Sequence, residues 1–399
     1  MLIGCVGKPS VGKSTFFKAA TLAEAEIANY PFTTIKPNRG MGFVKMECID
    51  KHFNKQCNPR EGYCVEHNRF VPIEMLDVAG LVPGAHLGLG RGNQFLDDLR
   101  QADALIHVID VSGSVNEKGE SVEPLSYDPA EDIKFLEIEL DMWYLGILQK
   151  GWDKFARQLQ QERGKVSAAL AKQLSGLGVT EIMIDQTIKQ LVLDPEKIVN
   201  WTAKDLENIA ITLRKKTKPM LIACNKIDVP GAYANFERLQ KTFPEYTLIA
   251  CSAESELALR EAAKHGLIDY IPGENNFAIQ NESALSEHQK NALTFIKENI
   301  LEKYKSTGVQ DVLDFAVFQL LKCIAIYPGG VNNLVDSQGR VLPDCFLMKE
   351  KSTALDFAYR LHTDFGKKFI RAIDVKTRMT VGRDHLLKHG DVMEIVSGK

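Results

Sequence analysis

Gly7-Lys8-Pro9-Ser10-Val11-Gly12-Lys13-Ser14 stands between the apolar run Leu2–Val6 and the stretch Thr15–Ala20. The apolar run predicts a buried strand, and the stretch after the motif predicts a helix. The eight residues match G-x-x-x-x-G-K-[ST] in the strand–loop–helix context that a phosphate-binding loop requires. The sequence therefore predicts an α/β domain built around this loop.

The chemistry of the loop follows from its residue types. Gly7 and Gly12 let the backbone curve around an anion, with its N–H groups turned inward. The helix that starts there adds the positive end of its dipole. We expect Lys13 to reach the β- and γ-phosphates of a nucleotide and the Ser14 hydroxyl to bind Mg²⁺. The other residues expected to line the nucleotide are Lys8, Pro9, Ser10, Val11 and Thr15.

Composition narrows the class of protein. With 399 residues, the chain exceeds one ordinary hydrophobic core, so we expect two or three domains. The formal net charge of −3 provides no global positive field, so any contact with RNA must come from a local patch. No apolar run approaches the ~20 residues of a membrane span. Because the chain also begins in a core strand, with no signal peptide, we expect a cytoplasmic protein.

A second phosphate-side element lies at the end of the predicted strand Phe70–Val78. There Asp77-Val78-Ala79-Gly80 forms a D-x-x-G pattern. We expect Asp77 to hold Mg²⁺ through water and the Gly80 N–H to contact the γ-phosphate. Earlier, the proline-containing segment 29–40 predicts a loop, in which a threonine hydroxyl could complete the Mg²⁺ shell.

Recognition of the base is predicted from Asn225-Lys226-Ile227-Asp228, which follows an apolar strand. The Asp228 carboxylate can accept two hydrogen bonds from guanine, whereas adenine has no matching pair of donors. We expect Asn225 to bond the purine edge and brace the phosphate loop, and the stem of Lys226 to cover the base. Backbone N–H groups of Ser252 and Ala253 are expected near the guanine oxygen.

The remaining segments suggest further domains. Residues 1–127 and 217–275 are expected to form the nucleotide-binding domain, and helical spacing over 128–216 predicts a helical, coiled-coil-like insertion. Residues 276–326 predict a helical linker, with a helix expected over 309–324. Residues 327–399 predict a small α+β domain, in which 341–343 is expected to be a strand. The charged face of the insertion is either solvated or a partner site. His107, in the apolar strand 104–110, is expected to be a hydrogen-bonded core residue.

The eight cysteines do not settle the question of metal binding. Cys5, Cys224 and Cys251 lie in apolar strands and are expected to be buried. Cys57 and Cys64 share a polar loop with His52 and His67. Two interpretations remain, a zinc site or reduced free thiols, because C-x6-C is not a common zinc spacing.

Three longer motifs resemble a known family. The first spans 30–40 and begins Tyr30-Pro31-Phe32-Thr33-Thr34. The second spans 77–85 and begins Asp77-Val78-Ala79-Gly80-Leu81-Val82-Pro83, and the third spans 90–96. With these the chain resembles the Obg-like branch of P-loop GTPases, near the YchF-related group, and 344–396 looks like a TGS domain, a β-grasp module. The resemblance implies Mg²⁺ ligands at Ser14 and Thr34, guanine recognition by Asn225, Lys226 and Asp228, and contact of the TGS domain with RNA or the ribosome. Lys349, Lys351, Arg360, Lys367, Lys368 and Arg371 would supply that contact, or else form a solvated surface.

Two departures from the family pattern affect the expected activity. The N-K-x-D element is intact, although many YchF-related proteins have a degraded one and prefer ATP, so we expect GTP here. Ser10 replaces an asparagine that is associated with potassium-stimulated hydrolysis, which leaves potassium dependence open.

Catalysis is expected to rest on Lys13, Thr34 and Gly80. Leu81 stands where Ras-like enzymes have a water-orienting glutamine, so we expect slow GTP hydrolysis, raised by a partner such as the ribosome or by a nearby group such as His86. The alternative is a nucleotide-binding adaptor whose insertion and TGS domain bind partners and whose hydrolysis is incidental. The oligomeric state is left open.

Overall fold

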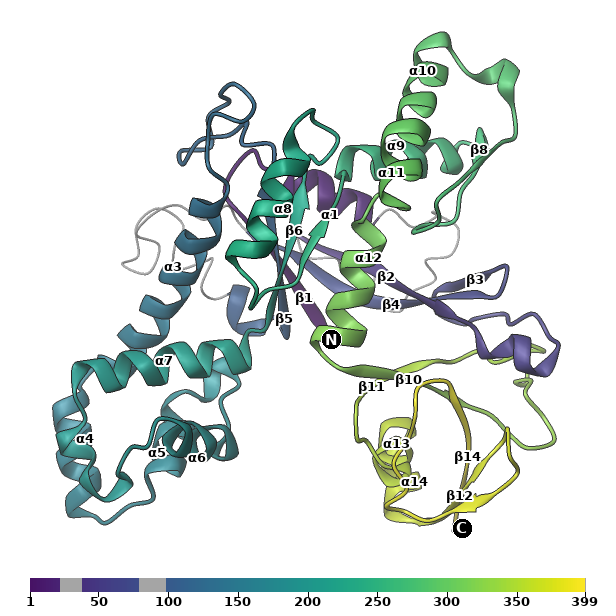
Figure 1. The fold of residues 1–399 in the computed structure, drawn as a ribbon. Helices are drawn as coiled ribbons and strands as arrows, with labels where there is room; N and C mark the ends of the chain where they lie inside the picture. The colour runs from purple at the N-terminus through teal and green to yellow at the C-terminus, as the bar shows by residue number, and fades with distance from the viewer. Residues whose placement is uncertain (22–37, 79–97, 399) are drawn as a thin grey trace.

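The computed structural model describes residues 1–21, 38–78 and 98–398 (Figure 1). The sequence predictions for Thr34, Gly80, Leu81 and His86 fall outside these ranges. Among the described helices, none is long and apolar enough to cross a membrane.

A seven-stranded sheet forms the centre of the first domain, in the order β2-β4-β1-β5-β6-β7 with β3 also paired to β4. Its parallel strands are β1 (Leu2–Val6), β4 (Asn68–Asp77), β5 (Ala104–Asp110), β6 (Met220–Asn225) and β7 (Leu248–Ala250), while β2 (Arg39–Glu47) and β3 (Tyr63–Val65) run antiparallel to β4. Every residue of β1, β5 and β6 is buried. Such continuous apolar strands are typical of a parallel sheet that is covered on both faces.

Helices cover the two faces of this sheet. On one face, α1 (Lys13–Thr21), α9 (Ala253–Lys264) and α12 (Val309–Asp314) pack over a core that includes Ile3 and Cys5. On the other face, α8 (Ala232–Thr242) and the start of α3 pack over Ile109 and Ile222. The result is a three-layer arrangement, which confirms the α/β class that the sequence predicted.

The chain between β5 and β6 forms a helical arm that projects from the sheet (Figure 1). It consists of α3 (Ala130–Gln149), α4 (Trp152–Gln161), α5 (Val166–Gln173), η3 (Ser175–Leu177), α6 (Glu181–Gln190), η4 (Pro195–Asn200) and α7 (Ala203–Thr217). The arm has its own core, in which Trp143, Leu170 and Leu213 are buried. Arg214, 1% exposed, donates from Nε to Asp141 Oδ1 at 2.8 Å and so joins α7 to α3.

The segment expected to be a linker is more integrated than that description implies. It contains β9 (Ala278–Ile279), which pairs with β8 (Ile268–Asp269) just before the segment. It continues with η5 (Glu282–Ala284), α10 (Glu287–Ile296), the π-helical turn η6 (Lys297–Leu301) and α11 (Glu302–Tyr304), followed by α12 and a second π-helical turn, η7 (Phe315–Leu320). Val309, Val312 and Ala316 belong to the same core as Ile3. This part of the segment therefore covers the nucleotide-domain sheet.

The C-terminal domain is a five-stranded sheet in the order β11-β10-β14-β12-β13. Its elements are β10 (Cys323–Pro328), β11 (Phe346–Lys349), α13 (Ala354–Leu361), α14 (Thr363–Lys367), β12 (Phe369–Asp374), β13 (Thr380–Val381) and β14 (Asp391–Ser397). The boundary predicted at 326/327 falls inside β10, which pairs with both β11 and β14. Val341–Pro343, expected to be a strand, contributes only an isolated bridge between Val335 and Val341, because its carbonyls face the first domain.

Arg69 of β4 holds the two domains together. Its side chain is 1% exposed, and its guanidinium donates to Leu342 O at 3.0 Å and Pro343 O at 3.1 Å. The same guanidinium lies 5.9 Å from the centre of the Tyr327 ring. Pro343 O also accepts from the Arg60 N–H at 2.9 Å, whereas Leu342 O has no other donor among the described residues. The buried arginine therefore fixes the relative position of the two segments, because without it Leu342 O would be left unpaired.

Candidate nucleotide-binding site

The predicted site residues gather at one edge of the parallel sheet. Cys5 pairs with Asp77, and Asp110 pairs with Asn225, so the carboxyl ends of β1, β4, β5 and β6 lie side by side. The phosphate loop follows β1 at this edge. Ligands of open α/β sheets bind outside the carboxyl ends of the strands, which is where the sequence placed them.

Two glycines of the phosphate loop are required by close contacts. A Cβ on Gly7 would lie 2.4 Å from Val108 O, and one on Gly12 would lie 2.2 Å from Asn225 Nδ2. Gly12 also has φ +88°, a conformation that side-chain-bearing residues rarely adopt. Val11 is fully buried, so it can offer only its backbone to a ligand, whereas Pro9 and Ser10 are exposed.

The phosphate-side groups come together in the structure. Lys13 Nζ is hydrogen-bonded to Asp77 Oδ1, and Ser14 Oγ donates to Asp77 Oδ2 at 3.3 Å. A hydroxyl and a carboxylate are the oxygen donors that Mg²⁺ prefers, so these residues fit the ion. Lys13 and Asp77 satisfy each other here, and a phosphate group would provide Lys13 with a competing partner.

Lys8 differs from the sequence expectation. Its ammonium group leaves the phosphate loop and pairs with Asp132 Oδ1 at 2.8 Å, Val115 O at 2.8 Å and the Tyr127 ring at 3.9 Å. The side chain is 6% exposed. Only the backbone of Lys8 is therefore placed to serve a nucleotide, while its side chain ties the loop to α3 because Asp132 lies in the first turn of that helix.

His107 is buried as expected, with 2% exposure, but its Nδ1 has no hydrogen-bond partner among the described residues. Burial, and then the charge of Lys8, lowers the pKa of His107 from 6.5 to about 3. The imidazole is therefore neutral near pH 7, consistent with a core residue rather than a catalyst.

Asn225 braces the site from both sides. Its Nδ2 donates to Val11 O at 2.9 Å, and its Oδ1 accepts from the Ala253 N–H at 3.0 Å. The Ser252 N–H donates to Thr307 O at 2.9 Å. Both amides expected to face the guanine oxygen thus have partners inside the protein, and the Ser252 hydroxyl caps α9 through the Ser255 N–H.

Lys226 and Asp228, the other two residues of the N-K-x-D element, differ in whether their side chains already have partners. Lys226 Nζ pairs with Asp110 Oδ2 at 3.0 Å and Ser114 Oγ at 3.2 Å, which holds its stem in place. Asp228 is half-buried, and within the described part of the chain no donor contacts its carboxylate. This carboxylate is available to a ligand that offers two N–H groups.

Sequence reasoning missed Asp110. Its carboxylate is fully buried at the end of β5 and accepts from the Ser112 N–H at 3.0 Å, as well as from Ser114 Oγ and Lys226. The signal was present in the sequence, because an apolar strand ends in this aspartate and two serines follow closely.

Comparison with known proteins decides the family. Residues 2–136 match a family model described as a 50S ribosome-binding GTPase, residues 223–331 match the G4 motif-containing domain of Obg-like GTPases of the YGR210-like type, and residues 336–397 match the TGS domain. The chain is 51% identical over 397 residues to an uncharacterized GTP-binding protein of Methanocaldococcus jannaschii, with 99% of each protein covered. The chain belongs to the Obg-like GTPases.

This Obg-like GTPase is also similar to a solved structure and to a bacterial protein. The crystal structure of a GTP-binding protein from Pyrococcus horikoshii OT3 superposes with a TM-score of 0.79 at 39% identity and covers 100% of both chains. The ribosome-binding ATPase YchF of Bacillus subtilis is 30% identical over 267 residues, which is 64% of this chain and 66% of that protein. The expected family, fold class and TGS domain are therefore confirmed, whereas the roles of individual site residues stay predictions.

Proposed function

We propose that this Obg-like GTPase is a cytoplasmic molecular switch that binds GTP with Mg²⁺, hydrolyses it slowly to GDP and phosphate, and couples that cycle to the ribosome. The observation that carries the proposal is the Asp228 carboxylate, half-buried and without a donor among the described residues, at the same sheet edge as the phosphate loop. Leaving a buried carboxylate unpaired is unfavourable, so a base with two donors binds there better than one with none.

The phosphate side of the proposal rests on Lys13, Ser14 and Asp77. On binding, Lys13 would exchange its contact with Asp77 for the β- and γ-phosphate oxygens and stabilise the negative charge that develops in transfer. Ser14 and Asp77, with Thr34, would hold Mg²⁺, which neutralises phosphate charge when bound. The Gly80 N–H would contact the γ-phosphate. Because Leu81 has no group that orients water, turnover should be slow without a partner.

The ribosome enters the proposal from relatives. The B. subtilis relative is described as ribosome-binding, and residues 2–136 match a family of 50S ribosome-binding GTPases. The TGS domain and its lysine- and arginine-containing surface would provide the contact. Since such contacts release counterions from RNA, binding should weaken as salt rises.

A base-swap experiment tests nucleotide choice. In Asp228→Asn, an amide donor replaces a carboxylate acceptor, so affinity should fall for GTP and rise for xanthosine triphosphate, which has a carbonyl in place of the exocyclic amine. Calorimetry with Mg²⁺ measures both nucleotides and ATP on the wild type and the variant. Equal affinity of the wild type for GTP and ATP would overturn the proposed specificity.

Single-turnover hydrolysis of GTP with and without ribosomes tests the switch. The expected result is slow cleavage by the protein alone and a faster rate with ribosomes. If ribosomes bind the protein but leave the rate unchanged, the adaptor function described above is the better account.

A further inference from the structure

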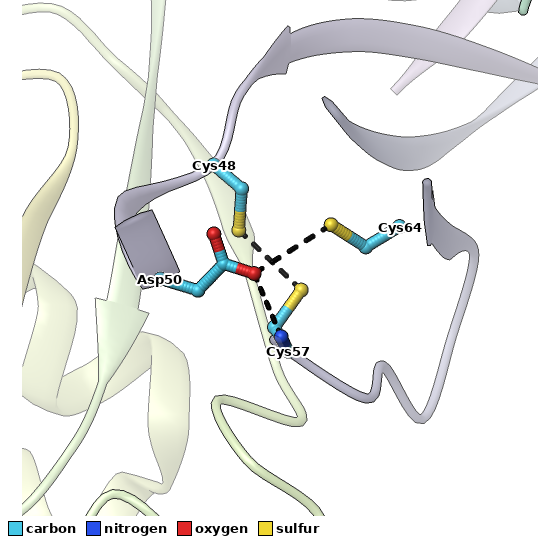
Figure 2. A group of neighbouring side chains, drawn as sticks. All are labelled: Cys48, Asp50, Cys57 and Cys64. Carbon is cyan, nitrogen blue, oxygen red and sulfur yellow. Dashed lines mark hydrogen bonds between the residues drawn. The ribbon is translucent and has the colours of Figure 1, made fainter. Parts of the chain in front are cut away.

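Three cysteines and an aspartate form a compact group outside the nucleotide site (Figure 2). Cys48 precedes the short helix η1 (Ile49–Phe53), Asp50 lies in it, Cys57 lies in the following loop and Cys64 lies in β3. The Cys48 and Cys57 sulfurs are 3.4 Å apart, and Cys64 Sγ is 3.8 Å from Asp50 Oδ2. All four ligand atoms lie within 4.8 Å of one another.

We propose that Cys48, Asp50, Cys57 and Cys64 bind a structural zinc ion. A tetrahedral site with Zn–S bonds of about 2.3 Å places neighbouring ligand atoms about 3.8 Å apart. The Cys48–Cys57 separation of 3.4 Å and the Cys64–Asp50 separation of 3.8 Å are close to that value, and no pair exceeds 4.8 Å, so the side chains need only modest adjustments to surround an ion. Four protein ligands leave no open position, which is typical of a structural rather than a catalytic zinc site.

Most of the group is shielded from water. Asp50 is fully buried, while Cys48 is 2% and Cys57 4% exposed. The Asp50 carboxylate accepts from the Cys57 N–H at 2.7 Å and contacts His67 Nδ1 at 2.9 Å. This histidine would orient the ligating carboxylate from outside the coordination sphere, as outer partners of metal ligands generally do.

The charges nearby complement a zinc–thiolate centre. Three thiolates and one carboxylate carry four negative charges, so the centre with Zn²⁺ would be negative overall. Arg69 lies beside it and donates from Nη1 to Cys57 Sγ at 3.5 Å. A buried guanidinium next to a sulfur ligand offsets the excess negative charge in a region where water cannot do so.

The ligand set differs from the one that the sequence suggested. Cys57 and Cys64 are retained, but the additional ligands are Cys48 and Asp50 rather than the two histidines. His67 contacts Asp50 instead of joining the group, and the His52 ring packs edge-on against Phe53 with centroids 5.0 Å apart.

The position of the group suggests what the ion does. The loop between Cys57 and Cys64 contacts the C-terminal domain through the Asn58 N–H to Val341 O at 2.9 Å and the Arg60 N–H to Pro343 O at 2.9 Å. Zinc would fix both ends of this loop. It would therefore hold the surface on which the TGS-side segment 341–343 rests.

Metal analysis of the full-length protein, purified without chelators, tests the proposal. We expect close to one zinc per chain by mass spectrometry, and near-background zinc in Cys57→Ser and Cys64→Ser. Cys224→Ala is the matched control, because Cys224 is fully buried in β6 and away from the group, and it should keep its zinc.

A second measurement on the wild type avoids dependence on variants that fail to fold. A mercurial thiol reagent should release zinc, detected with a chromogenic chelator, in proportion to the modification of three thiols. The proposal is overturned if the wild type, incubated with zinc and desalted, retains almost none. It is also overturned if folded Cys57→Ser and Cys64→Ser keep their zinc.

Discussion

Replacement of Asn225 by alanine separates bracing of the site from reading of the base. The change removes the bonds to Val11 O and from the Ala253 N–H, at 2.9 and 3.0 Å, inside a region where Asn225 itself is 3% exposed. Each bond contributes about 1 kcal/mol, and each stranded group costs about 1–3 kcal/mol where water is excluded. We expect a total loss of roughly 2–5 kcal/mol.

That loss should lower the melting temperature by roughly 4–20 °C, given about 2–4 °C per kcal/mol for a domain of this size. Affinity for GTP and ATP should fall together, because the phosphate loop that both use has lost its brace. The assay is a thermal melt with a fluorescent-nucleotide titration.

Asp228→Ala is the matched control. Asp228 lies three residues after Asn225, and no donor within the described ranges contacts its carboxylate. The melting temperature of the variant should therefore stay near that of the wild type, while its preference for GTP over ATP is lost. If Asn225→Ala melts like the wild type, or loses only GTP, the bracing argument is wrong.

Three other changes probe the scaffold. Arg69→Met leaves Leu342 O without a donor at the domain interface, so the variant should lose about 2–4 kcal/mol of folding stability. Protease cleavage between the two domains should then be faster than in the wild type, and an unchanged cleavage rate would contradict this. In the folded protein the pKa of His107 is about 3, so its imidazole stays neutral down to that pH. In the unfolded chain the pKa is 6.5, so the imidazole takes up a proton once the pH falls below that value. The stability of the wild type should therefore fall relative to His107→Leu by about 1.6 kcal/mol between pH 6.5 and pH 5. An equal change in the stability of both proteins over that range would refute this. Lys8→Met removes the cationic partner of Asp132 and leaves it only the Tyr127 hydroxyl, so the variant should be destabilised by about 3 kcal/mol while GDP affinity changes little. A large loss of GDP binding at constant melting temperature would show that Lys8 contacts phosphate directly.

Prediction from sequence worked best where function depends on contiguous residues. The loop from Gly7 to Ser14 could be recognised because its backbone shape and its helix start are set locally. The sheet edge that joins Asp77 and Asn225 followed from the rule that ligands bind at the carboxyl ends of parallel strands. The direction of the Lys8 side chain could not be predicted, because its partner Asp132 lies in a helix far along the chain.

The role of residues 309–321 also required the structure. Their apolar pattern predicted a helix but gave no indication of what it packs against, and the structure shows that they cover the nucleotide-domain sheet. The strand expected at 341–343 was wrong for a related reason. Its carbonyls bond to Arg69 across the interface, so the segment does not need strand partners.

By itself the sequence determined the phosphate loop, the N-K-x-D element and the α/β class, since each is written in neighbouring residues or in a short-range period. Only the tertiary structure decided that Cys48 and Asp50 join Cys57 and Cys64, and that Arg69 links the two domains. The physical reason is that contacts between side chains of separate segments depend on how the strands and loops pack. Local sequence propensity does not determine that packing.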